Sequence, residues 1–317
     1  MRSGAAHVAG AVRARALVRR CVGPASARVL AGSPGLDAAI GMLASGPYGR
    51  EVRPGQDAQS VQDAVSRTAL WHLRILAGWL PRDGVEQLRA LAGWFEIRNV
   101  ERMLRRGRGY GRGHDGPAPF RLGSLAVVRP PLSATFTVDQ VRAALASSAW
   151  GDPGAATARA IGQGMRATWA VRAAAVPAAE PWAAGGLALT VARERWLTGR
   201  PLTEAAHTRA AGLLGRRALD AASFAGFVAA LPAPAAWALA DVREPDALWR
   251  AEAGWWARVD RDAHGLLHAA GFDGRPAIGA AAALAVDAWR VRAAVAAATD
   301  GAGTGRYDAM MDAGHQE

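Results

Sequence analysis

Apolar residues recur along most of this 317-residue chain with the three-to-four-residue spacing of amphipathic helices. In residues 60–80 the apolar positions repeat from Val61 to Leu76, and a proline follows the end of the run. The same spacing predicts helices over residues 36–44 and over residues 13–29, the latter interrupted by a glycine–proline pair. The pattern is therefore typical of a helical protein.

A predicted helix begins near Val85 and closes with residues 93–105. It carries polar residues inside its apolar stripe. At about 100° per residue, one face collects the following positions: Leu88, Ala92, Phe95, Asn99 and Met103. Glu96 lies at the edge of this stripe. A buried polar group without a partner is destabilising by about 1–3 kcal/mol. We therefore expect Glu96 and Asn99 to hydrogen-bond a neighbouring turn.

Strand signals are few. Residues 124–128 are the only short β-like run, and a Pro-Pro pair stops it. The predicted fold class is all-α.

Two segments resemble each other without gaps. Residues 36–49 (LDAAIGMLASGPYG) and 138–151 (VDQVRAALASSAWG) match at Asp, Leu, Ala, Ser and Gly positions, and Tyr48 is answered by Trp150. Each predicts a short helix that ends in a turn of small residues followed by an aromatic residue. This similarity indicates an internal repeat.

The acid-then-polar spacing of Glu96 and Asn99 recurs twice. Asp220 and Ser223 repeat it in residues 219–228, and Asp287 and Arg290 repeat it in residues 286–291. Residues three apart share one face of a helix. We therefore expect three helical repeat units, in residues 1–107, 116–231 and 232–300, followed by a flexible, glycine-rich tail in residues 301–317.

Residues 105–119 (RRGRGYGRGHDGPAP) separate the first two predicted units. Glycine and proline at this density do not sustain a helix, and the expected structure is a linker. An arginine–glycine tract with Tyr110 also suits RNA binding through stacking and phosphate contacts, which is the alternative interpretation.

Composition qualifies that alternative. The formal net charge is +11, and every basic residue is arginine. Together with abundant alanine and glycine, this usage is typical of a G+C-rich genome, so the charge is a weak indication of nucleic-acid binding. The single cysteine, Cys21, excludes an intramolecular disulfide and suggests a buried structural thiol. The longest apolar run, residues 277–286, is about half the ~20 residues needed to span a bilayer.

No catalytic constellation is evident. The chain lacks a phosphate-binding loop and a nucleophile elbow. His264 and His268 have the four-residue spacing of a metal-chelating pair on a helix, but a third ligand is not evident. We expect no catalytic residue, no cofactor and no metal, and interpret the histidines as a partly exposed pair.

Several motifs resemble the C/d family of rotary ATPase proteins, which form the socket of the central stalk in V-type and A-type complexes. The most specific is residues 94–105 (WFEIRNVERMLR), which resembles the family's acid-x-x-Asn helix followed by a hydrophobic residue and Leu-Arg. Further similarities lie, in chain order, in residues 12–17, 43–49, 122–125 and 276–292. The sequence departs from the family at Ser223 and Arg290, where asparagine is more frequent.

The resemblance implies a pseudo-threefold funnel of three helical domains. It implies a non-catalytic protein that links the central rotor stalk to the membrane proteolipid ring, for ATP-driven ion transport or ATP synthesis. The expected partners are stalk proteins of the D/F type and the ring. The expected location is peripheral, on the cytoplasmic side of a bacterial plasma membrane, without insertion into it and without nucleic acid.

In this interpretation the acid–polar pairs Glu96/Asn99, Asp220/Ser223 and Asp287/Arg290 hold helix–helix contacts inside each unit. Arg98 and Arg105, on the outer face of their helix, are candidates for contact with an acidic stalk surface. Two alternatives remain open: a basic, helical nucleic-acid-binding protein, and an all-helical scaffold or metal-binding protein that uses His264 and His268.

Overall fold

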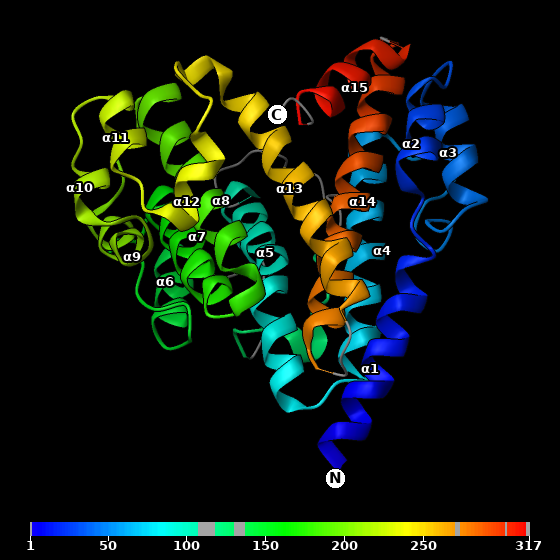
Figure 1. Ribbon diagram of the computed structural model, residues 1–317, viewed down its shortest axis with the longest axis horizontal. Helices are drawn as coiled ribbons and strands as arrows, with labels where there is room; N and C mark the ends of the chain where they lie inside the picture. Colours follow the sequence, from blue (N-terminus) through cyan, green and yellow to red (C-terminus); the bar gives the residue numbers. More distant parts are fainter. Residues whose placement is uncertain (1, 107–117, 130–136, 270–272, 302, 315–317) are drawn as a thin grey trace. The chain divides into compact units, whose positions relative to one another are not determined.

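The computed structural model describes residues 2–106, 118–129, 137–269, 273–301 and 303–314 (Figure 1). These residues form helices joined by turns, and no strand occurs among them, which confirms the all-α class. The predicted β-like run instead contains a 3-10 turn, η1 (Gly123–Leu125). The backbone N–H groups of Val127 and Val128 donate to the side chain of Glu96. They are therefore not available to pair with a second strand.

The chain folds into two compact units: unit 1 comprises Met1–Leu88 and Trp256–Glu317, and unit 2 comprises Arg89–Trp255. The boundaries of these units fall inside the long helices α5 (Arg82–Arg106) and α13 (Leu248–His268). They do not coincide with the three consecutive units expected from the sequence, because the last long helix packs among the first ones. Residues 107–117 of the predicted linker lie outside the described residues.

In unit 1, a long C-terminal helix lies among N-terminal helices. Besides parts of α5 and α13, the unit contains α1 (Arg2–Val18), α2 (Gly23–Ala31), α3 (Leu36–Ala44), α4 (Ala58–Ala77), α14 (Arg275–Thr299) and α15 (Gly303–Asp312). α14 packs against α1, α2 and α4 (Figure 1). Half of its buried residues are alanine, so neighbouring helices approach it closely.

Gly279 lies where α14 approaches α13 closely. A Cβ atom there would lie 2.7 Å from the carbonyl oxygen of Ala263 and 3.0 Å from the Cβ of Leu266, both on α13. We expect Gly279→Ala to destabilise the protein by about 1–3 kcal/mol, because backbone atoms must move. Gly265, on α13 with open space around it, is the matched control, and its replacement by alanine should stabilise by about 0.5–1 kcal/mol. Urea unfolding measures both, and changes of the same sign would contradict this packing.

Residues 301–317 were expected to be a flexible tail, but residues 303–312 form helix α15. Tyr307 of this helix is only 3% exposed and belongs to the hydrophobic cluster of α2, α3, α4 and α14. Arg28 of α2 donates two hydrogen bonds to the carboxylate of Asp308. The aromatic anchor and the ion pair explain why a glycine-containing segment is held in place.

Unit 2 contains shorter helices around α7 and α8. In chain order they are the remainder of α5, η1, α6 (Val138–Ala146), α7 (Ala158–Ala174), η2 (Pro177–Ala179), α8 (Glu180–Ala192), the π-helical turn η3 (Arg193–Leu197), α9 (Glu204–Leu214), α10 (Arg216–Leu219), α11 (Phe224–Ala230), α12 (Ala233–Ala236), η4 (Trp237–Leu239), η5 (Pro245–Ala247) and the start of α13. One hydrophobic cluster joins α5, α6 and α7, and another joins α7 to α12. α7 contacts both clusters through different faces.

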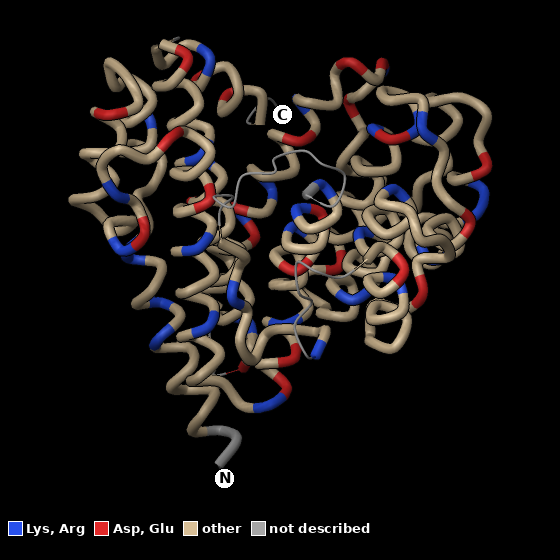
Figure 2. The backbone as a smooth tube through the Cα atoms, turned by 180° about the vertical axis from the view of Figure 1, so that it is seen from behind, with Lys and Arg blue, Asp and Glu red and all other residues tan. Residues whose placement is uncertain are grey.

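Acidic and basic positions are interspersed along the helices of both units (Figure 2). Within the described residues, no helix is both long enough and apolar enough to cross a bilayer.

Candidate functional site

Glu96, on α5, lies at the centre of a polar clamp in unit 2. Its side chain is 7% exposed and accepts three hydrogen bonds. The donors are the backbone N–H of Val127 (3.2 Å), the backbone N–H of Val128 (3.0 Å) and the indole Nε1 of Trp150 (2.7 Å). One carboxylate thus ties α5 both to the segment before α6 and to the turn after it.

Asn99, one helical turn further along α5, holds the start of the same segment. Its Nδ2 donates to the carbonyl oxygen of Phe120 and its Oδ1 accepts from the backbone N–H of Phe120, each at 2.8 Å. The amide therefore pairs with both backbone groups of one residue, as a neighbouring strand would. The expectation that Glu96 and Asn99 bind a neighbouring turn is confirmed.

Asp287, on α14, forms a second clamp in unit 1. Its carboxylate is 3% exposed and accepts from the backbone N–H of Val22 (3.1 Å), the backbone N–H of Gly23 (2.8 Å) and the hydroxyl of Tyr48 (2.8 Å). Gly23 has φ of +76°, a conformation that favours glycine, so its N–H can face the carboxylate at the start of α2.

The two clamps share one chemical plan. In each, a buried carboxylate on a long helix accepts from two consecutive backbone N–H groups and from one aromatic polar group. The aromatic residues are Tyr48 and Trp150, which the sequence comparison of residues 36–49 and 138–151 aligns. The local repeat predicted from the sequence therefore has a structural counterpart. In unit 1 the carboxylate comes from a helix near the opposite end of the chain from its partners.

Arg290 does not play the role of Asn99. It is 9% exposed and its guanidinium donates to the carboxylate of Asp260 on α13, with a closest distance of 2.7 Å. Arg290 therefore holds α14 to α13, a helix–helix contact of the kind expected for the acid–polar pairs. Asp260 could not be identified from the sequence, because it lies 30 residues before Arg290 and no local spacing links the two residues.

Asp220 and Ser223 do not share a helix face, contrary to the prediction. Asp220 follows α10, and its carboxylate lies 3.0 Å from Nε2 of His207. Ser223 is the N-cap of α11 and its hydroxyl accepts from the backbone N–H of Gly226 at 3.1 Å. The helix breaks between them, because serine at an N-cap binds the backbone that a continuous helix would use.

A different polar pair holds a neighbouring loop of unit 2. Gln163 of α7 is 6% exposed, and its Oε1 accepts from the backbone N–H of Thr203 at 2.9 Å. Its Nε2 donates to the carboxylate of Glu194 at 3.0 Å. Glutamine and glutamate come from two helical elements here, so no single acid-x-x-polar spacing marks them in the sequence.

The two arginines proposed to face a stalk differ in exposure. Arg98 is half-buried, with its guanidinium 5.0 Å from the ring centroid of Phe120. Arg105, near the end of α5, is exposed. Arg105 is therefore the better candidate for contact with a partner.

Burial raises the pKa of Glu96 above its usual value, more than its three N–H donors lower it. A raised carboxyl pKa stabilises the folded state at pH values below the unfolded-state pKa, and this contribution is lost as the pH rises through the folded-state pKa. We expect the free energy of unfolding of the wild type, relative to that of Glu96→Gln, to be larger near about pH 4 than near about pH 7. Urea unfolding of both proteins across this range tests the prediction, and a difference that grows with pH would contradict it.

Cys21 lies beside the second clamp. Burial, followed by the negative charge of Asp287, raises the pKa of its thiol to about 12. A thiol that stays protonated is a poor nucleophile, which agrees with the interpretation of Cys21 as structural.

His264 and His268 both lie on α13, but each ring is bonded to backbone. Nδ1 of His264 is 2.8 Å from the carbonyl oxygen of Asp260, and Nδ1 of His268 is 2.8 Å from that of His264. Within the described part of the chain, no three His, Cys, Asp or Glu side chains are grouped to hold a metal ion.

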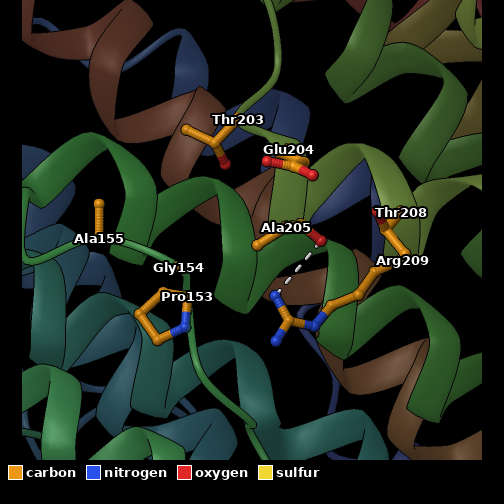
Figure 3. A pocket seen from close by; sticks show the side chains of 8 residues that line it. All are labelled: Pro153, Gly154, Ala155, Thr203, Glu204, Ala205, Thr208 and Arg209. Carbon is orange, nitrogen blue, oxygen red and sulfur yellow. Dashed lines mark hydrogen bonds between the residues drawn. The ribbon is translucent and has the colours of Figure 1, made fainter.

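Two hollows occur in unit 2. One, of about 480 Å³, lies between residues 153–155 and the start of α9 (Figure 3). Arg209 borders it, but its guanidinium donates to the carbonyl oxygens of Ala205 and Asp152. The other, of about 290 Å³, is bordered by Arg195 and by the His207–Asp220 pair. Neither hollow is lined by a nucleophile with an adjacent base.

The chain matches no known protein-family model, and no curated protein matches it.

Proposed function

We propose that this protein is a non-catalytic coupling component of a V/A-type rotary ATPase, placed between the central stalk and the proteolipid ring. The observation that carries the proposal is the duplicated clamp, in which Glu96 and Asp287 hold equivalent turns through equivalent bonds. The resemblance to the C/d family rests on the same acid-x-x-Asn helix.

The chemistry of the clamps agrees with a mechanical role. Both carboxylates are buried and bonded to three donors of this chain, so neither is directed at a substrate. Buried and satisfied polar networks make a fold rigid and fix one packing arrangement. Torque transmission needs such rigidity, together with contact surfaces for two partners.

The proposed partners are D/F-type stalk proteins and the ring, on the cytoplasmic side of a bacterial plasma membrane. A three-domain funnel is the arrangement implied by the resemblance. The separate hydrophobic clusters, one around α14 and two that meet at α7, support a repeated construction.

Co-expression of the full chain with the stalk and ring proteins of the same organism tests the proposal. The tagged chain should retain both partners through purification and size-exclusion chromatography. Failure to retain either partner would overturn the proposal. Association with RNA in their place, weakening steeply with salt, would favour the nucleic-acid-binding alternative.

A charge reversal tests the proposed interface residue. Arg105→Glu should weaken stalk binding about tenfold or more and leave ring binding unchanged, because a rim charge acts on its own interface. Arg74→Glu, at an exposed position of α4, is the matched control. Equal stalk binding by both variants would remove Arg105 from the interface.

A further inference from the structure

Basic side chains of unit 1 converge where α1 meets α4. Arg13 lies on α1, four residues before the buried Leu17, and Arg20 lies in the turn that follows this helix. α1 packs against α4, which carries His72. The positive charges of Arg20, Arg13 and Arg50 all act on the His72 ring.

Arg50 reaches this position from the turn after α3. Its guanidinium lies 4.4 Å from the ring centroid of Trp71, and that ring makes an edge contact with His72 at 4.9 Å between centroids. A cation–π contact fixes the guanidinium without neutralising its charge.

Arginines outnumber acidic partners in the ion pairs at this place. The carboxylate of Glu51 is shared by Arg50, at 3.6 Å, and Arg67, at 3.3 Å. Among the described residues, Arg13 and Arg20 form no ion pair with an acidic side chain. The carboxylate of Glu51 is thus divided between two arginines, and a bound anion would relieve the repulsion among the guanidinium groups at this place.

Two buried nitrogen atoms point to a missing ligand. Within the part of the chain that the structure describes, Nε of Arg13 and Nδ1 of His72 are buried and have no hydrogen-bond partner. His72 is only 6% exposed. Buried polar atoms are nearly always paired, so the Nε–H of Arg13, which can only donate, calls for an acceptor.

We propose that Arg13, Arg20 and Arg50 form a binding site for a phosphate group at the contact of α1 and α4. Guanidinium groups recognise tetrahedral oxyanions through paired N–H donors. A phosphate, with a charge of about −1.5 to −2 at neutral pH, compensates the positive charge of these arginines better than a single carboxylate does. His72 forms the base of the site. This site is independent of the proposed role in a rotary ATPase.

Calorimetry with inorganic phosphate and the full-length chain tests the site. The wild type should bind phosphate saturably at constant ionic strength. Arg20→Gln and Arg50→Gln, both at exposed positions, should each weaken binding at least about tenfold, whereas the neighbouring Arg19→Gln should not. Circular dichroism confirms that each variant is folded. Equal weakening by Arg19→Gln, or equal binding of acetate, would overturn the assignment.

The His72 ring supplies a second measurement. Burial and the nearby arginines lower its pKa to about 4 in the free protein. A bound anion opposes those positive charges, so phosphate should raise the pKa, as followed by NMR of the ring protons. A pKa of His72 that is unchanged at saturating phosphate would overturn the site.

Discussion

Replacement of Asp287 by alanine is expected to destabilise the protein by about 3–5 kcal/mol, because it leaves three donors of the clamp without an acceptor. These donors are the backbone N–H groups of Val22 and Gly23 and the hydroxyl of Tyr48. Asp287 and Tyr48 are almost fully buried, so water does not readily take the place of the carboxylate. Urea unfolding monitored by tryptophan fluorescence measures the change.

Two further variants separate the contributions to this clamp. Tyr48→Phe removes only one donor and the bond it makes, so it should destabilise by about 1 kcal/mol. Asp287→Asn keeps one carbonyl acceptor but turns an NH₂ group toward a donor, so its effect should fall between the other two. If Asp287→Ala is no worse than Tyr48→Phe, the carboxylate does not organise the turn as described.

The aromatic partners of the two clamp carboxylates, Glu96 and Asp287, could be predicted in part from the sequence. The alignment of residues 36–49 with 138–151 places Tyr48 opposite Trp150, and both side chains donate to a clamp carboxylate. A short helix, a turn of small residues and an aromatic residue occur in both copies. Their spacing is local, so the pattern can be recognised in a single chain.

The pairing of the N-terminal copy with Asp287 could not be predicted in the same way. Asp287 lies 264 residues from Gly23 and 239 residues from Tyr48 in the sequence. No periodicity links positions that far apart, and the division into consecutive units placed them in different domains. The close packing of alanine-rich α14 against α1, α2 and α4 brings them together.

The error at Asp220 and Ser223 has a local cause. The spacing of an acid and a polar residue fits one helix face, but serine also favours N-cap positions. Here the N-cap preference prevails: Ser223 begins α11, and Asp220 turns to His207. The sequence is compatible with a continuous helix and with an N-cap at Ser223. The packing of Phe224 and Phe227 into the hydrophobic cluster of α7–α12 favours the N-cap.

Replacement of Glu96 by alanine should likewise destabilise the protein by about 3–5 kcal/mol, because three donors lose their acceptor. Trp150→Phe should itself cost about 2 kcal/mol, through the lost indole bond and the space left in the core. The double variant should be less destabilised than the sum by about 1–2 kcal/mol, since the two changes remove the same bond. Urea unfolding of the two single variants and the double variant measures this coupling.

Trp255→Phe provides the control for this cycle. The indole of Trp255 donates to the carbonyl oxygen of Trp182, outside the Glu96 clamp, so its effect should add to that of Glu96→Ala within about 0.5 kcal/mol. Equal coupling of Trp150 and Trp255 to Glu96 would indicate a general loss of packing and contradict a specific clamp. Coupling confined to Trp150 would establish that Glu96 and Trp150 act together in one clamp, which ties α5 to the turn after α6.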